Sequence, residues 1–280
     1  MLKLAVTFGE SSHFDAVEDR DDLERRFQPC IPDDISYRLG NIRLGNEFCE
    51  RLMPSSNQTR NAIFKADRFN LPFSLVLSNL TDKGHKKLKR LLPVLPDNTD
   101  VTVNDWGTAA LVSSEYPNLS VTAGRLLCKH LKEARISTPD ADPEVVWPIS
   151  SKQFQKVLGG LGIQNAEVDL APHTRPPAKK TPGFSVSLHL QRGYSAKSHV
   201  CKVGSINLPP EKKFAPGHLC RRECLDYVSP VIEQPHPKKD ALPVFQRGNT
   251  WFYEYSERMN AAIATAIENS VIDQAIVTLD

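Results

Sequence analysis

Short runs rich in apolar and β-branched residues alternate along this chain with segments of helical or loop character. Several of these runs are apolar on both faces or nearly so, which is typical of parallel strands covered by helices. They predict eight strands, at residues 2–9, 35–41, 72–80, 100–107, 119–125, 165–172, 184–191 and 274–279.

Two of the intervening segments have a clear helical pattern. Residues 84–95 and 151–162 each place an apolar stripe opposite lysines, with Thr81 and Ser151 as candidate N-caps. Eight strands with helices between them in a chain of this length predict an α/β fold. We expect a TIM-barrel-like (β/α) barrel, complete or degraded, that forms a single domain over residues 1–280.

Three stretches interrupt the pattern and are predicted to be irregular loops. They are rich in proline, charged residues and turn formers, and they cover residues 134–148, 171–183 and 207–218.

Composition excludes several classes of protein. Hydrophobic residues make up 40% of the chain and charged residues 24%, which is ordinary globular usage. A formal net charge of +2 is too small to attract nucleic acid or a membrane surface by bulk electrostatics. Six cysteines in 280 residues are too few for a disulfide scaffold.

The N-terminus begins like a signal peptide but turns acidic at Glu10, too soon for an apolar core. No stretch approaches 18 uninterrupted apolar residues, so we expect no membrane span. A cytoplasmic location follows as the default. Thiols stay reduced there, and clustered cysteines then favour metal binding over disulfides.

The cysteines are the most informative chemical feature. Cys201, Cys220 and Cys224 lie within 24 residues, among basic side chains. The spacing of Cys220 and Cys224 would place their sulfurs one helical turn apart on the same side. Cys49 follows the second expected strand, and Cys201 follows the strand-like region that begins at residue 184. Because strand C-terminal ends form the working face of a barrel, all four could gather around one point.

Four thiolates can hold either a tetrahedral zinc ion or a 4Fe-4S cluster. Structural zinc sites usually show two close pairs of ligands, whereas this chain has one C-x3-C pair and two distant single cysteines. The spacing therefore favours a cluster, with zinc as the alternative. We assign Cys30 and Cys128 to packing. His199 and His218, each two residues before a cysteine, are substitute ligands.

Other candidate residues follow expected strands. Asp105 is a candidate acid–base group, although an Asn-Asp turn explains it equally well. Arg125 could bind a substrate carboxylate, or form a salt bridge to a strand end such as Asp105. Asp169 and His189 would line the barrel mouth. We find no supported Ser-His-Asp arrangement, no HExxH motif and no phosphate loop, so peptidase activity is the weaker interpretation.

The order of several motifs resembles a known family. The segments VNDWG (103–107) and AGRLL (123–127) precede the late block with Cys201 and the C-x3-C pair. This order is similar to that of the collagenase-like peptidase family (peptidase family U32-like), and within it the short UbiU/UbiV branch. The resemblance runs from about residue 35 to the C-terminus.

This resemblance implies a barrel-like fold and a 4Fe-4S cluster held by Cys49, Cys201, Cys220 and Cys224. It also implies oxygen-independent hydroxylation in ubiquinone biosynthesis, on a small aromatic or isoprenoid substrate, by a heterodimer with a related UbiU-like subunit. A different class of function stays open: a non-catalytic scaffold in which zinc or a cluster pins the late loop to the barrel.

Overall fold

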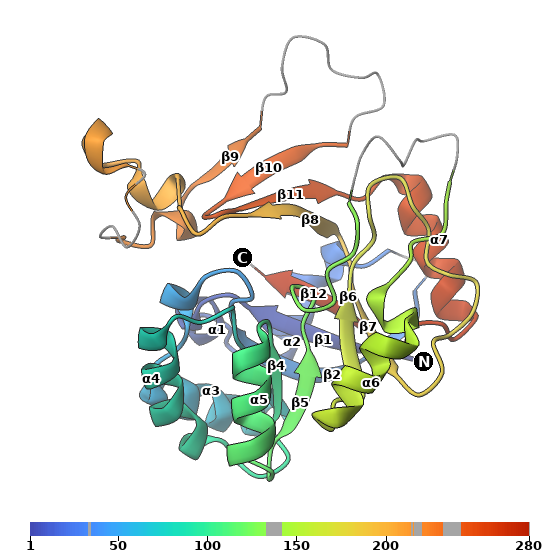
Figure 1. The fold of residues 1–280 in the computed structure, drawn as a ribbon, viewed down its shortest axis with the longest axis horizontal. Helices are drawn as coiled ribbons and strands as arrows, with labels where there is room; N and C mark the ends of the chain where they lie inside the picture. The colour runs from blue at the N-terminus through green and yellow to red at the C-terminus, as the bar shows by residue number, and fades with distance from the viewer. Residues whose placement is uncertain (33–34, 133–141, 214, 216–219, 232–241, 280) are drawn as a thin grey trace.

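The computed structural model describes residues 1–32, 35–132, 142–213, 215, 220–231 and 242–279. Eight parallel strands form a closed barrel, as the hydrophobic pattern predicts (Figure 1). The last strand closes the ring by pairing with the first, in a register that runs from Lys3↔Gln274 to Phe8↔Leu279. In chain order the barrel strands are β1 (Leu2–Phe8), β2 (Tyr37–Gly45), β3 (Phe73–Val76), β4 (Asp100–Val103), β5 (Ser120–Ala123), β6 (Asn165–Val168), β7 (Ser185–His189) and β12 (Gln274–Leu279).

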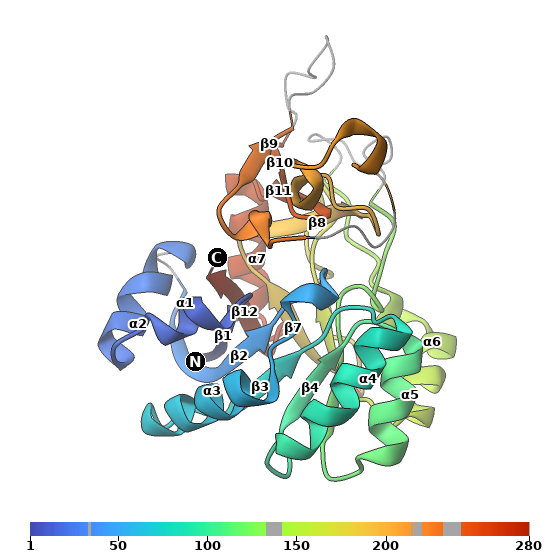
Figure 2. The ribbon, with the colours of Figure 1, turned by 90° about the vertical axis from the view of Figure 1, so that its left-hand side faces the viewer.

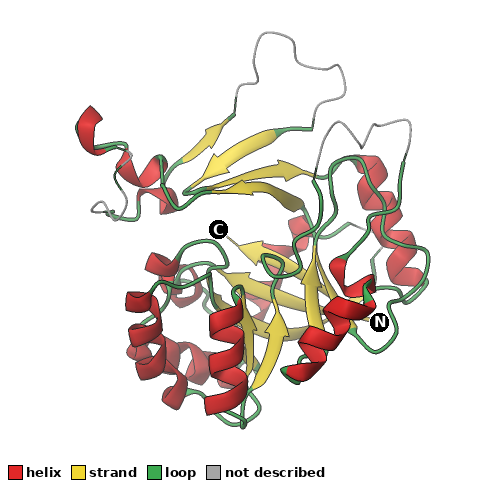
Figure 3. Ribbon diagram, in the orientation of Figure 1, coloured by secondary structure: helices red, strands yellow, loops and turns green. Residues whose placement is uncertain are grey.

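Helices cover the outside of the barrel (Figures 1 and 3). Thr81 caps one of them, as predicted, by accepting a hydrogen bond from the Gly84 N–H. Ser151 stands at the predicted N-cap position of another, but its side chain makes no capping bond. The helices are α1 (Ser11–Asp15), α2 (Arg20–Phe27), α3 (Ser56–Arg68), α4 (Asp82–Leu91), α5 (Trp106–Glu115), α6 (Lys152–Gly160) and α7 (Glu257–Glu268).

The barrel interior is polar, whereas the sequence pattern indicated strands that are apolar on both faces. Outward residues such as Val101 and Val186 are fully buried in the main hydrophobic core. Alternate residues point inward and meet across the barrel: Arg43 of β2 donates to Thr102 of β4 at 3.0 Å, and Thr102 donates to Glu167 of β6 at 2.7 Å. These strands are not neighbours in the ring, so their side chains can meet only inside it.

A second sheet, which the sequence analysis missed, is inserted between β7 and α7. It is antiparallel, with the strand order β8-β11-β10-β9, and lies over one end of the barrel (Figures 1 and 2). Its Tyr194 and Phe252 pack against Phe48, which follows β2, so the covered end is the one at which the barrel strands finish. The strands are β8 (Arg192–Lys197), β9 (Val228–Pro230), β10 (Val244–Arg247) and β11 (Thr250–Glu254).

The predicted loops are irregular where the structure describes them. Residues 171–183 contain only an isolated bridge from Arg175 to Glu144, and residues 207–213 contain a single 3-10 turn at Pro210–Lys212. Residues 134–141, 214 and 216–218 of these predictions lie outside the described residues. Among the helices described, none combines the length and the hydrophobicity that a membrane crossing requires.

Candidate metal centre and adjoining pocket

Cys49 lies in the loop that follows β2, at the working end of the barrel. The Asn46 side chain organises this loop by accepting hydrogen bonds from the backbone N–H groups of Phe48 and Cys49, both at 2.9 Å. Cys49 then starts the 3-10 turn Glu50–Leu52. The prediction that Cys49 stands just beyond a barrel strand is confirmed.

The three late cysteines reach the same region from the inserted segment. Cys201 follows β8 of the second sheet, so it does not follow a barrel strand directly as the sequence analysis supposed. The prediction of one helical turn between Cys220 and Cys224 is wrong. Arg222 between them adopts a left-handed backbone with φ 65°, and only Cys224 lies in a 3-10 turn, Glu223–Leu225.

The structure brings the four cysteines together. Cys49, Cys201 and Cys224 share one hydrophobic cluster with Leu52 and Val203. Cys220 lies close enough for its charge to act on the other three thiols. All four are free thiols. Among the described residues, no three cysteine sulfurs lie within 4.8 Å of one another. The four cysteines therefore share one region without forming a closely packed set of ligand atoms.

Backbone groups already point at two of these sulfurs. The Gly204 N–H donates to Cys201 Sγ at 3.1 Å, and the Arg222 N–H donates to Cys220 Sγ at 3.3 Å. Gly248 passes so close to Cys224 that a Cβ there would lie 3.3 Å from the cysteine Cβ. Hydrogen bonds from backbone N–H groups to sulfur are a feature that stabilises thiolate ligands.

Burial favours the protonated form of three of these thiols, Cys49, Cys201 and Cys224. It raises the pKa of Cys49 and Cys201, and it raises the pKa of Cys224 to about 12, with the neighbouring cysteines adding to each shift. Metal binding at this set must therefore release protons, and its affinity must rise with pH.

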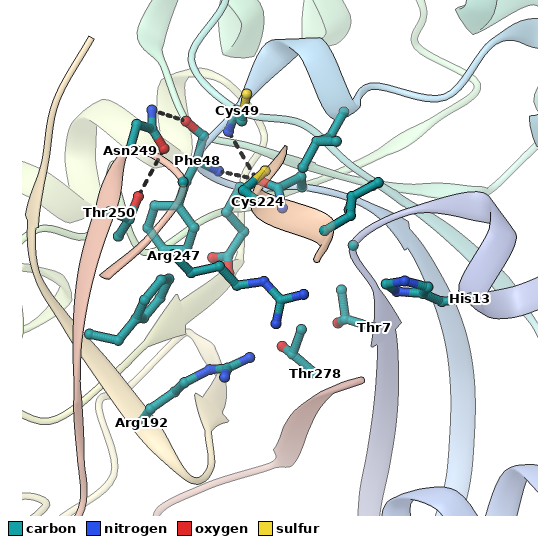
Figure 4. A pocket seen from close by; sticks show the side chains of 18 of the residues that line it. Thr7, His13, Phe48, Cys49, Arg192, Cys224, Arg247, Asn249, Thr250 and Thr278 are labelled. Atoms are coloured by element: carbon teal, nitrogen blue, oxygen red, sulfur yellow. Dashed lines mark hydrogen bonds between the residues drawn. The ribbon is translucent and has the colours of Figure 1, made fainter. Parts of the chain in front are cut away.

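A pocket of about 60 Å³ adjoins Cys49 and Cys224, between the barrel mouth and the inserted sheet. Figure 4 shows Arg192 and Arg247 reaching into it from the sheet, opposite Thr7 and Thr278 of the barrel. Such a volume holds roughly four water molecules, so the pocket as it stands accepts a small group rather than a ring system.

Arg125 lines this pocket but is itself buried, and its partner is Glu47 rather than the predicted Asp105. Its guanidinium binds Glu47 through two nitrogens, Nε at 3.0 Å and Nη2 at 2.8 Å, and lies 3.7 Å from Asp169. Burial opposes the charge on Arg125, but the two carboxylates outweigh it and raise its pKa. Arg125 therefore links the loop after β2, through Glu47, to the end of β6, through Asp169.

Asp105 has a structural role. One carboxylate oxygen accepts from the Thr108 N–H at 2.7 Å, which caps α5. The other accepts from the Thr108 hydroxyl at 2.7 Å and from the Leu80 N–H at 3.0 Å. The turn interpretation of Asp105 thus accounts for all of these contacts, and Asp105 does not line the pocket.

A buried ion network lies inside the barrel, and the sequence analysis named three of its members, Arg125, Asp169 and His189. His189 Nε2 lies 2.9 Å from Glu167 and 3.6 Å from Glu47. These three form the one group of metal-type ligand atoms within 4.8 Å among the described residues. However, Arg43 already pairs with Glu167, as Arg125 does with Glu47, so both carboxylates have their countercharge without a metal.

Asp169 joins the network through Lys132, whose ammonium lies 2.6 Å from it. Burial lowers the pKa of Lys132 to about 8, although Asp169 opposes the shift.

The sequence does contain a signal for this network, which is the presence of acidic residues within an otherwise apolar strand. In NAEVDL (165–170), Glu167 and Asp169 alternate with apolar residues.

The remaining cysteines and histidines that the sequence analysis considered have other settings or are not described. Cys128 is buried in the core, and burial raises its pKa; Cys30 packs at the core margin. His199 is exposed, and His218 lies outside the described residues.

No family model matches this sequence, and no curated protein matches it significantly.

Proposed function

We propose that this chain is an iron–sulfur protein in which Cys49, Cys201, Cys220 and Cys224 hold a 4Fe-4S cluster. The observation that carries the proposal is the convergence of four free thiols from distant parts of the chain at the mouth of a closed barrel. Thiolates are the protein ligands of iron–sulfur clusters, and four of them hold a 4Fe-4S cluster.

The donor set fits a cluster better than a single metal ion. Tetrahedral zinc, with Zn–S bonds of about 2.3 Å, requires sulfurs about 3.8 Å apart. No three of these sulfurs lie within 4.8 Å of one another, so the cysteines do not form a preassembled tetrahedral zinc site. The N–H groups of Gly204 and Arg222 would donate to coordinated Cys201 and Cys220.

A bound cluster would supply one-electron transfer. The residues of this chain would set its environment: burial by Leu52 and Val203 excludes water, and hydrogen bonds to the sulfurs stabilise the reduced state. The guanidinium of Arg247 also acts on Cys224, lowering the pKa of this thiol against the larger effect of burial.

We further propose that the chain is a UbiV-like subunit of an oxygen-independent hydroxylation system in ubiquinone biosynthesis. The support is the resemblance of VNDWG, AGRLL and the cysteine block to the UbiU/UbiV branch, together with the barrel that this resemblance implies. A UbiU-like partner subunit, a small aromatic or isoprenoid substrate and a cytoplasmic location belong to the same proposal.

A structural zinc scaffold is the second candidate, and the small pocket favours it. A cavity of about 60 Å³ leaves no room for a ring-shaped substrate without movement of the inserted sheet. Peptidase activity is less well supported. The thiols that line the pocket, Cys49 and Cys224, have pKa values raised by burial, which makes them poor nucleophiles.

Anaerobic purification followed by iron, sulfide and zinc analysis tests the proposal. We expect iron and sulfide in equal amounts and a broad visible absorption band. Cys49→Ser should lose most of the iron, because this ligand comes from a different part of the chain than the other three. Cys30→Ser, a partly buried cysteine outside the set, is the matched control and should keep it.

Stoichiometric zinc in a colourless protein would favour the scaffold instead. Unchanged iron in Cys49→Ser would overturn the four-ligand assignment, whatever the spectrum of the unmodified chain.

A further inference from the structure

The end of the barrel at which the strands begin is hollow and polar. It is the end that the inserted sheet does not cover (Figure 1). A cavity of about 630 Å³ lies there, within the size range of small-molecule sites. Bulky aliphatic side chains commonly fill the inside of a (β/α) barrel, but here every barrel strand contributes a polar residue to the lining. These residues are Lys3, Asn41, Ser74, Asp100, Thr122, Asn165, Ser187 and Gln274.

Several of these polar side chains bind one another around the cavity. Gln274 of β12 donates to Asn41 of β2 at 2.9 Å, although β1 lies between the two strands, so the bond crosses the inner side of β1. Asn41 in turn donates to the Ser74 hydroxyl at 2.8 Å. Further round the ring, the Thr122 hydroxyl donates to Asp100 at 2.7 Å. The lining is therefore held in place by the barrel itself.

Arg43 gives the observation that indicates a ligand. It lines the cavity and is only 2% exposed. One guanidinium nitrogen, Nη2, donates to Thr102 at 3.0 Å and pairs with Glu167. The other, Nη1, is buried and has no hydrogen-bond partner within the described parts of the chain. Buried donors are nearly always paired, so Nη1 calls for an acceptor that those parts do not supply.

Asp100 offers the complementary group on the same cavity. Burial raises the pKa of Asp100 to about 6, with Arg43 opposing the shift, so the carboxylate is largely ionised at neutral pH. Arg43 can only donate hydrogen bonds, and an ionised Asp100 can only accept them. A hydroxyl group does both, so one hydroxyl satisfies the two residues together.

The charges around the cavity favour an uncharged ligand. The described lining holds three cationic side chains and three carboxylates, so neither sign of ion is preferred. The rest of the polar lining consists of hydroxyl and amide groups, which both donate and accept hydrogen bonds. The charged residues are Lys3, Arg38, Arg43, Asp100, Glu167 and Asp273.

We propose that this cavity binds an uncharged polyhydroxyl compound, a small sugar or polyol, with one hydroxyl between Arg43 Nη1 and the Asp100 carboxylate. The hydroxyl oxygen accepts from the guanidinium, and its hydrogen is donated to the carboxylate. Asn41 and Asn165 supply donors and acceptors for the other hydroxyls. The site lies at the opposite end of the barrel from Cys49, so it does not require the proposed cluster.

Saturation-transfer NMR of the full chain with D-glucose, myo-inositol and glycerol, each tested alone, examines this site. Acetate and methylammonium, at constant ionic strength, are the charged control probes. We expect saturable binding of at least one polyhydroxyl probe and none of either ion. Saturable binding of an ion without any polyhydroxyl probe would overturn the proposed ligand class. Absence of binding by all three polyhydroxyl probes would overturn the site.

Variants locate the site. Asp100→Asn keeps the shape but removes the ionic acceptor, and should weaken binding by about tenfold or more, the scale of one hydrogen bond to a charged group. Asp97→Asn, an exposed residue before the same strand that does not line the cavity, is the matched control and should bind normally.

A second pair of variants closes the cavity without altering its buried groups. Ser120→Trp, at the exposed rim, should abolish binding and leave the melting temperature unchanged. Ser114→Trp, on the exposed surface of α5, is its control and should bind normally. Equal losses in Asp100→Asn and Asp97→Asn, or full binding by Ser120→Trp, would overturn the site.

Iron analysis of the same samples separates this site from the proposed cluster. Ser120→Trp should lose the polyhydroxyl probe and hold as much iron as the unmodified chain. A chain that binds the probe but never holds iron would contradict only the proposed cluster.

Discussion

The barrel and the inserted sheet contribute to the same site but are built in different ways. The strands of the barrel are buried on both faces: outward residues of β4 to β7 lie in the main core, and inward ones join a buried ion network. In the inserted sheet, all three residues of β9 are exposed and all four of β10 are half-buried. The barrel is therefore a rigid base, whereas the sheet is held by fewer buried contacts.

This difference matches the division of roles at the site. The barrel provides Cys49, Thr7 and Thr278, which are fixed by strand ends. The inserted segment provides Cys201, Cys220 and Cys224, and also Arg192 and Arg247. Function that depends on adaptable loops placed on a rigid scaffold is common in proteins. Four predictions follow from this contrast; three of them pair a site with a matched control variant, and the one at His130 is compared with the unmodified chain.

The largest effect is expected inside the barrel. Glu167→Ala would leave Arg43 buried without its partner, and we expect a loss of about 3–5 kcal/mol in the free energy of unfolding. Glu115→Ala breaks the half-exposed pair with Lys89 and should cost no more than about 1 kcal/mol. Urea denaturation measures both. A loss below about 1 kcal/mol in Glu167→Ala would contradict the network as a structural element.

The second effect concerns the acid stability of the barrel mouth. Burial lowers the pKa of His130 to about 4, against the opposing pull of Asp169 at 3.8 Å. Because the folded pKa lies below the unfolded value of about 6.5, the contribution of His130 to stability is present above that pH. It is lost as the pH falls toward 4.

We therefore expect His130→Leu to reduce the loss of stability between pH 7 and pH 4 by roughly 2 kcal/mol. Lys132 and Arg125 also face Asp169, so this carboxylate keeps two cationic partners when the imidazole is removed. Asp100, whose pKa burial raises to about 6, acts with the opposite sign, so the comparison is made as a difference from the unmodified chain. Identical pH profiles for the two proteins would refute the prediction.

A smaller effect is expected at the turn of the inserted sheet. Gly248 has φ +58°, and an added Cβ would lie 3.3 Å from the Cβ of Cys224. Gly248→Ala should therefore cost about 1 kcal/mol or somewhat more. Gly159→Ala, in α6 with open space around it, should instead stabilise the chain by about 0.5–1 kcal/mol. Thermal denaturation that gave both variants the same sign would contradict this assignment.

The smallest effect is expected at the exposed strand β9. Val228 is 51% exposed, so Val228→Thr should change stability by no more than about 0.5 kcal/mol. The same substitution at Val101 of β4, which is fully buried, places a hydroxyl in the core and should cost about 1–3 kcal/mol. Equal costs in denaturant titrations would mean that the sheet is as tightly packed as the barrel.

The barrel could be predicted from sequence because its signal is local. Each expected strand overlaps an observed one, and the rule that functional residues follow strand ends placed Cys49 correctly. The inserted sheet was missed because its strands are short and less apolar, and they pair with each other across the long segment that carries the cysteines. Few local features distinguish the residues of β8 from a loop.

Side-chain partners were harder to predict than strands. The salt bridge expected for Arg125 exists, but with Glu47, which lies 78 positions away in the chain. Whether Arg125 pairs with Glu47 or with Asp105 depends on which of the two loops places its carboxylate within reach of the guanidinium. Asp105 is turned away by its own helix cap, and that geometry emerges only after the fold is complete.

The way in which the inserted segment leaves and rejoins the barrel has a consequence for evolution. The segment departs after β7 and returns before α7, and its two ends are tied by the pairing of Arg192 with Glu254 and by the bond from the Tyr255 N–H to the Gln191 carbonyl at 3.0 Å. Because the two ends of the inserted segment lie side by side, the segment can be lengthened or exchanged at little cost in loop-closure entropy. The segment between Arg192 and Glu254 could thus be exchanged as one unit, and the cysteines and arginines that it carries would be exchanged with it.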